Sequence, residues 1–172
     1  MSDLQKLIAL LILKAAPQDL TYSPQITAQY AVAYILSGVF VLQTTINPDD
    51  MLAGLFLGLV IQGVFTYFVL RALNHSARFI QTLGAIIGVG VLFNLLSWPV
   101  LSVLADDANV DSLRSTMSLM FLLLISWEVL VKAHIFKHAL EMKMYSALAL
   151  SFSLFFISIA LSQLLFPAET AG

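Results

Sequence analysis

The strongest constraint on the fold is a pair of long apolar segments in the C-terminal part of the chain, separated by a short charged one. Ser115 to Val131 contains a single ionisable residue, Glu128, and Met144 to Phe166 contains none. A hydrocarbon core of about 30 Å is crossed by roughly 20 apolar helical residues, and in lipid a helix satisfies its own backbone polar groups. The two segments therefore predict a helical hairpin across a membrane, with its basic turn on one side.

The composition extends this prediction to the whole chain. Of its 172 residues, 60% are hydrophobic and 10% are charged, whereas soluble domains carry about 25% charged residues. Charged side chains this scarce cannot cover a water-facing surface. The protein must therefore face lipid. The chain has no cysteine, which excludes disulfides and thiolate chemistry.

Three further apolar segments precede the hairpin, at residues Ile26–Ile46, Met51–Leu70 and Phe79–Leu104. Each is long enough to cross a bilayer. We therefore predict an all-α fold, a polytopic membrane helical bundle with five transmembrane helices. Its two parts are a cytoplasmic interfacial helix with its linker (residues 1–25) and the five-span transmembrane domain (residues 26–172).

The N-terminal segment Ser2–Ala16 predicts an amphipathic helix that is too short to span. We interpret it as a helix in the headgroup layer, with Lys6 and Lys14 reaching water. A secretory signal is the alternative interpretation, and Lys14 and Pro17 directly after the apolar run argue against cleavage there. The apolar positions follow the i, i+3, i+4 spacing of one helix face: Leu4, Leu7, Ile8, Leu11, Ile12 and Ala15.

The basic residues predict the orientation of the bundle, since loops on the cytoplasmic side carry an excess of Lys and Arg. With a cytoplasmic N-terminus, Arg114 is the one basic residue outside. This asymmetry predicts a bacterial inner-membrane protein with a periplasmic C-terminus. In this orientation the basic residues on the cytoplasmic side are Lys6, Lys14, Arg71, Arg78, Lys132, Lys137 and Lys143.

Small residues recur at helix-packing spacing. Gly54 and Gly58 share one face of the second span with Gln62, and Gly84 and Gly88 share a face of the third. Such spacing lets helix backbones approach closely in lipid, and a Gln side chain can hydrogen-bond across. We interpret these faces, and one marked by Ser151, Ser158 and Ser162 in the fifth span, as packing within the bundle. A homodimer seam or a substrate path is the alternative.

Glu128 is the carboxylate that lies well inside an apolar segment. An ionisable residue inside a membrane is a functional-site hypothesis by default. Lys132 follows at i+4, in the favourable order for an ion pair along a helix. We interpret the two as a salt-bridged anchor, with a proton-transfer or ligand-binding role as the alternative.

His134, His138 and Glu141 fall on one face if the helix continues past the membrane edge. Two histidines at i, i+4 with a carboxylate can bind a divalent metal such as zinc, but three neighbouring lysines disfavour a cation. We therefore interpret the segment as a solvated basic turn that attracts anionic lipid headgroups, by about 1 kcal/mol per basic residue. No metal and no cofactor is predicted.

The third span ends in a polar stretch that contains Asn94, Ser97, Trp98 and Pro99. A proline inside a helix frees a backbone carbonyl one turn upstream, so we interpret the stretch as a structural kink. A cavity for lipid or solute is the alternative. The spans hold no ladder of acidic residues, so an ion-coupled transporter would lack its usual groups.

Catalytic and nucleic-acid-binding signatures are absent from the sequence. It contains no P-loop and no dinucleotide fingerprint, and no nucleophile elbow. The basic residues sit at predicted membrane edges, so nucleic-acid binding has no support.

With these elements in place, the chain resembles the Yip family of Ypt/Rab-interacting proteins, in a short bacterial form. Asp19-Leu20 followed by Pro24 is similar to the family's Asp-Leu-x-Gly-Pro motif, just before the first span. Ile125–Leu150 and Arg78–Leu104 are similar to the family's fourth and third spans. The resemblance implies a five-span fold and a membrane-organising or partner-binding role, without implying a reaction.

Three functional hypotheses follow. The leading one is a non-enzymatic scaffold or accessory protein that binds membrane lipids, another membrane protein or a second copy of itself. The second is a small transporter or channel subunit with a polar path along Glu128, Gln62 and Asn94. The third is a metal-dependent membrane enzyme at His134, His138 and Glu141.

Overall fold

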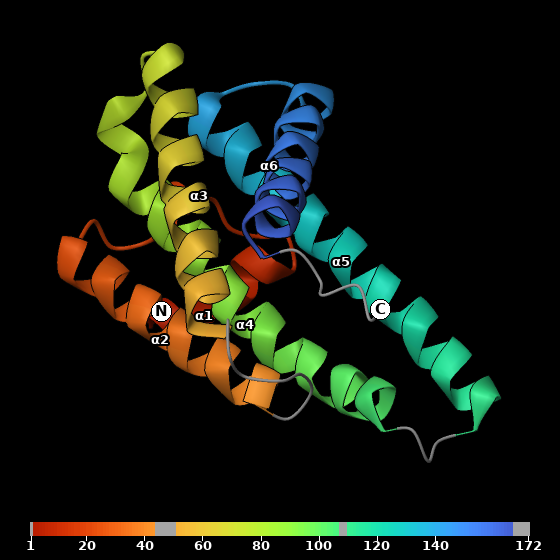
Figure 1. Cartoon of the computed structure of the whole chain (residues 1–172). Coiled ribbons are helices and arrows are strands. Elements are labelled where there is room, and N and C mark those ends of the chain that lie inside the picture. The colour runs from red at the N-terminus through yellow and green to blue at the C-terminus, as the bar shows by residue number, and fades with distance from the viewer. Residues whose placement is uncertain (1, 44–50, 107–109, 167–172) are drawn as a thin grey trace.

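The computed structural model describes residues 2–43, 51–106 and 110–166, and in these ranges it is helical without any strand (Figure 1). Five helices are long and apolar enough to span a membrane, which confirms the predicted all-α bundle. The helices are α1 (Asp3–Leu11), α2 (Pro24–Gln43), α3 (Met51–Ala72), α4 (Phe79–Ala105), α5 (Asp111–Leu140) and α6 (Met144–Leu165), with short 3-10 turns at η1 (Pro17–Asp19) and η2 (Ser76–Arg78).

Helix α4 lies at the centre of the bundle, where it packs against α1, α2, α3 and α5. Its glycines let these neighbours approach closely. A Cβ atom at Gly84 would lie 3.0 Å from Thr27 Oγ1 of α2, and one at Gly88 would lie 2.7 Å from Leu7 Cδ2 of α1. Both glycines therefore lie at helix contacts, where a larger side chain would push the neighbouring helix away.

Helix α5 differs from the prediction at its C-terminal end. The helix continues through the segment predicted as a charged turn and ends at Leu140, so the turn is reduced to residues 141–143. Lys132 pairs with Glu128 inside the helix, so the chain does not have to leave the membrane at Lys132. The 30 residues of α5 extend about 45 Å at 1.5 Å per residue, longer than a hydrocarbon core of about 30 Å.

The N-terminal helix is present and packs against α4 and α5. Leu7 and Leu10 are buried, whereas Leu4, Ile8 and Ile12 stay exposed. Side chains of α5 cap its C-terminal end, since Trp127 Nε1 donates to Leu11 O at 3.1 Å and His134 Nε2 to Ala15 O at 3.0 Å. Carbonyls at a helix end need such partners, so residues 1–25 are tied to the five-span part of the chain.

We call the end of the bundle marked by Arg71, Arg78, Lys137 and Lys143 the basic end, and the end where α3 begins and α6 ends the opposite end. At the basic end, the linker after α1 is fastened to α4 and α5. Gln18 Nε2 donates to His138 O at 2.7 Å.

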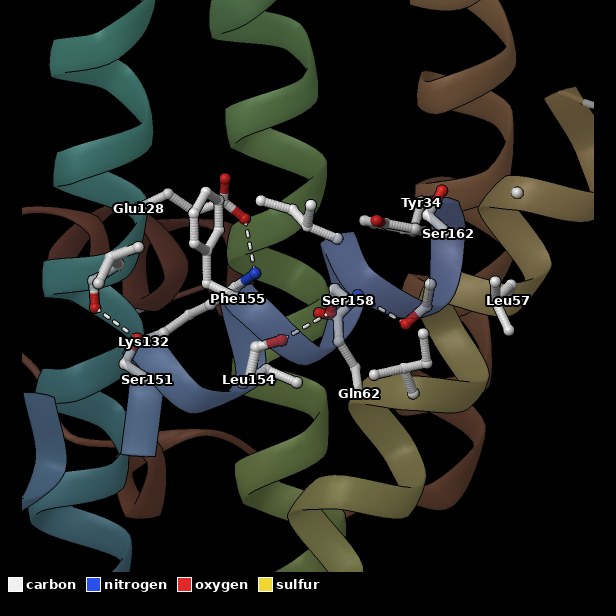
Figure 2. Close-up of a pocket in the computed structure, with 15 residues that line it drawn as sticks. Tyr34, Leu57, Gln62, Glu128, Lys132, Ser151, Leu154, Phe155, Ser158 and Ser162 are labelled. Atoms are coloured by element: carbon white, nitrogen blue, oxygen red, sulfur yellow. Dashed lines mark hydrogen bonds and ion pairs between the residues drawn. The ribbon is translucent and has the colours of Figure 1, made fainter. Parts of the chain in front are cut away.

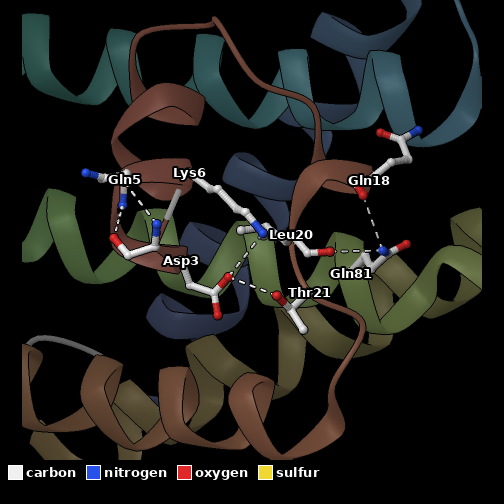
Figure 3. Close-up of polar contacts among 8 residues, drawn as sticks. Asp3, Gln5, Lys6, Gln18, Leu20, Thr21 and Gln81 are labelled. Carbon is white, nitrogen blue, oxygen red and sulfur yellow. Dashed lines mark hydrogen bonds and ion pairs between the residues drawn. The ribbon is translucent and has the colours of Figure 1, made fainter.

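The short motif on which the Yip resemblance partly rests, Asp19-Leu20 followed by Pro24, lies in this linker and at the start of α2. Leu20 is buried and its carbonyl accepts from Gln81 Nε2 at 3.1 Å (Figure 3). Asp19 Oδ2 accepts from Ala16 N at 2.8 Å, and Pro24 begins α2. These residues therefore shape the linker and its attachment to α4.

Candidate functional site: a polar cavity between the membrane-spanning helices

A cavity of about 320 Å³ lies between α2, α3, α5 and α6 (Figure 2). Its polar lining comes from near the middle of the spans: Gln62 is central in Leu52–Ala72, and Tyr34 is central in Pro24–Gln43. The site therefore lies near the mid-depth of the membrane that these helices would cross. Its polar lining residues are Tyr34, Gln62, Glu128, Lys132, Ser151, Ser158 and Ser162.

Glu128 and Lys132 form an ion pair on the wall of this cavity. Lys132 Nζ lies 2.6 Å from Glu128 Oε1, and the side chains are 15% and 31% exposed, respectively. An isolated charge at this depth would be expensive, so pairing lets both groups stay ionised. The cavity thus presents a cation and an anion with no net charge between them.

Gln62 of α3 brings an unused acceptor to the cavity. The residue is 5% exposed, and its Nε2 donates to Gly58 O at 3.2 Å. Its Oε1 has no hydrogen-bond partner among the residues that the structure describes. A buried acceptor without a partner is costly, so this atom is available to a donor from a bound molecule.

The serines of α6 add further acceptors. Ser151 Oγ donates to Val129 O at 2.7 Å, and Ser158 Oγ donates to Leu154 O at 2.8 Å. Their protons are committed to the backbone, so what they offer to the cavity is the lone pairs of their oxygens. The cavity is therefore rich in acceptors, with the Lys132 ammonium as a donor.

Two glycines that were predicted to pack against a neighbouring helix line the cavity instead. A Cβ atom at Gly54 would have no atom within 4 Å, and one at Gly58 would lie 3.6 Å from the Tyr34 hydroxyl. In this part of the bundle the small residues leave space beside α6, whereas Gly84 and Gly88 of α4 bring helices together. Glycines four residues apart thus leave room for a cavity in α3 and allow close helix contact in α4.

The cavity reaches the opposite end of the bundle, and the helices pack against each other toward the basic end. Gly54 in the first turn of α3 and Ser162 in the last turn of α6 both line it, and Ser162 is exposed. Toward the basic end, Phe136 is fully buried and packs edge-on against Phe65, with ring centroids 6.0 Å apart. The cavity therefore extends as a vestibule from mid-depth toward the opposite end, and packed side chains lie between it and the basic end.

Asn94, the third polar residue predicted inside the spans, lines a second cavity of about 230 Å³. Its Nδ2 donates to Ser37 Oγ at 3.0 Å and to Tyr34 O at 3.3 Å, which joins α4 to α2. Glu128 lines this cavity as well as the first. The three residues of the predicted polar path therefore lie around two adjacent spaces that meet at Glu128.

The predicted histidine cluster at the basic end is divided in the structure. The rings of His134 and His138 lie with centroids 4.5 Å apart, but the helix ends before Glu141, which adopts a left-handed conformation at φ 55°. Glu141 pairs with Arg78 instead. No group of three or more potential metal ligands occurs in the described part of the chain.

Neither a protein-family model, nor a curated protein, nor a solved structure matches this chain.

Tyr34 is the site residue that the sequence reasoning missed. It lines the cavity together with Lys132, Glu128 and Gln62. A tyrosine at the centre of a span, away from the interfaces where this residue type is common, was the available signal.

We expect loss of one member of the Glu128–Lys132 pair to be worse than loss of both. Glu128→Gln or Lys132→Met leaves the other charge unpaired and should lower the free energy of unfolding by up to about 3 kcal/mol. The double variant removes both charges and should recover part of that loss. Thermal unfolding of the four proteins in one detergent measures this, and strictly additive losses would contradict an energetic coupling between the two side chains.

A pH dependence is expected at the basic end. The Arg78 guanidinium holds the pKa of the Glu141 carboxyl below its usual range, by a hydrogen bond and by its charge. The stabilisation is therefore complete above the unfolded pKa of about 4.3, and it is lost as the pH falls through the lower folded pKa. The melting temperature of the wild type should exceed that of Glu141→Gln at pH 7, and the difference should vanish in acid. A difference that is independent of pH would show that the ion pair is not its cause.

Proposed function

We propose that this protein is a non-enzymatic membrane protein that binds a small polar ligand of no net charge near the middle of the bilayer, as a small transporter or its binding subunit does. The observation that supports this most is the convergence of Gln62, Glu128 and Lys132 on one cavity. Polar groups at this depth are expensive in lipid, and transporters place their binding sites at the midplane.

The form of the cavity supports the same proposal. It extends toward the opposite end, from which we propose that the ligand enters, and the packed Phe65–Phe136 contact lies between it and the basic end. A binding site with access from one side is one of the two states that alternating access requires. The adjacent cavity at Asn94 shares Glu128 with the first and adds two further polar side chains, Asn94 and Ser97, beside the ion pair.

A second candidate function is the binding of another membrane protein, in keeping with the Yip resemblance. The N-terminal half of α5 favours it, since Leu119, Leu122 and Leu123 are each about 60% exposed. These positions are spaced i, i+3 and i+4, so they lie on one side of the helix, and this half of α5 has a continuous apolar stripe exposed there. A partner helix in the membrane would find van der Waals contact there.

Native mass spectrometry of the gently extracted protein tests the ligand proposal. The wild type should carry a bound small molecule, and Gln62→Leu and Glu128→Gln should lose most of it, because each removes a polar partner in the cavity. Gln163→Leu is the matched control, since Gln163 is exposed on α6 and is not part of the cavity. Equal retention by all four proteins would overturn the proposal, and a bound polypeptide in place of a small molecule would support the second candidate.

A further inference from the structure

An apolar groove of about 630 Å³ adjoins the polar cavity between α3 and α6. Val60, Val64 and Phe68 of α3 line it, together with Ile157 and Leu161 of α6. All of its lining side chains are apolar, and Val60, Val64 and Phe68 are more than 40% exposed. The groove is therefore open along its length and offers nothing to a polar group.

The groove and the cavity share two lining residues, Leu57 and Ile61. A polar compartment and an apolar one thus meet at these two side chains. From Leu57 the groove follows α3 as far as Ala72, near the basic end. That length is about 22 Å at 1.5 Å per residue, compared with about 15 Å for half of a hydrocarbon core.

The charges and acceptors of the polar compartment are complementary to those of a zwitterionic headgroup. Lys132 is a cation, Glu128 an anion, and Gln62 Oε1 a buried acceptor with no partner among the described residues. The serine oxygens of α6 are further acceptors, because their protons are already donated. A phosphate beside Lys132 and an ammonium beside Glu128 and Gln62 would satisfy these groups without adding net charge.

The direction of the two compartments also fits a lipid. The cavity extends toward the opposite end, and the groove runs from the cavity toward the basic end. A lipid of the leaflet at the opposite end already has its headgroup on that side and its chains pointing inward. Such a lipid reaches the site by moving deeper along its own axis, with no inversion.

We propose that the cavity and the groove form one lipid site, which holds the headgroup of a zwitterionic aminophospholipid of the phosphatidylethanolamine class against Lys132, Glu128 and Gln62, and an acyl chain along α3. This inference rests on the proposed function, and it assigns the class of the ligand. The unpartnered Gln62 oxygen selects an ammonium that keeps its N–H donors, so a phosphatidylcholine headgroup fits less well. The negative net charge of phosphatidylglycerol is not balanced by the neutral ion pair.

Photo-crosslinking tests the assignment. The full chain is reconstituted in phosphatidylcholine vesicles with a trace of phosphatidylethanolamine that carries a diazirine at the end of one chain, and labelled residues are mapped by mass spectrometry. The groove on α3 and α6 should be labelled several-fold more by this probe than by phosphatidylglycerol or phosphatidylcholine probes with the same chain. The exposed face of α2 around Val32, which is 60% exposed, should be labelled equally by all three.

Two pairs of variants separate the headgroup from the chain. Gln62→Leu should reduce the phosphatidylethanolamine labelling of the groove to the level of the other probes, and Gln163→Leu should not. Val64→Trp should fill the groove and reduce its labelling, whereas Val32→Trp, at an equally apolar and exposed position of α2, should have no effect. Groove labelling that is equal for all three headgroups, or that is unchanged in Gln62→Leu, would overturn the lipid assignment.

The outcomes also separate this inference from the function on which it rests. If Gln62→Leu and Glu128→Gln release a small molecule from the purified protein while groove labelling ignores the headgroup, the cavity binds a polar ligand that is no lipid. If neither the bound mass nor the labelling depends on these residues, both proposals are overturned.

Discussion

The ion pair between Glu128 and Lys132 is the constraint on which the rest of the site depends. Two charges near the middle of a membrane must neutralise each other and retain some polar surroundings. The i, i+4 spacing on one helix supplies the first condition, and the cavity with Tyr34, Gln62 and the α6 serines supplies the second. Because Lys132 is paired inside the span, α5 can continue to Leu140 as one helix.

The central position of α4 explains how a bundle of this size can contain a cavity. Glycines on α4 allow α1 and α2 to approach closely, so the packed part of the protein gathers around this helix. Helix α3 packs against α2 and α4, whereas α6 packs against α5 and α3, and both have few buried residues of their own. Space between α3 and α6 is therefore left on the side away from α4, and both the polar cavity and the apolar groove lie there.

Much of the fold follows from the sequence because membrane length and apolar composition act over whole segments. The starts of α3, α4 and α6 agree with the predicted starts of their apolar segments, whereas α5 begins at Asp111, ahead of the apolar segment that starts at Ser115. The end of α5 could not be predicted, because a pattern of charges does not reveal that His134 binds the backbone carbonyl of Ala15 in the linker. The docking of α1 was missed for the same reason, since burial of Leu7 depends on Gly88, which is distant in sequence.

The candidate site, like the fold, could be predicted from the sequence only in part. Glu128, Gln62 and Asn94 could be selected from the sequence, because a polar residue inside an apolar run is conspicuous. Their grouping around two cavities required the structure, and so did the role of Gly54, whose spacing alone predicts packing. The apolar groove on α3 carried no distinct sequence signal, because a stripe of valines is an ordinary part of a membrane helix.

The central claim is that polar groups near mid-depth line a vestibule that water enters from the opposite end. Since the chain has no cysteine, single cysteines introduced by Ser158→Cys and Ser153→Cys on α6 test it directly in sealed vesicles. Ser158 lines the cavity and Ser153 is exposed outside it, and a thiol must ionise to react. A charged, membrane-impermeant thiol reagent should modify the cysteine at 158 from the side of the opposite end and leave the one at 153 unmodified. Equal protection of both positions would contradict the account.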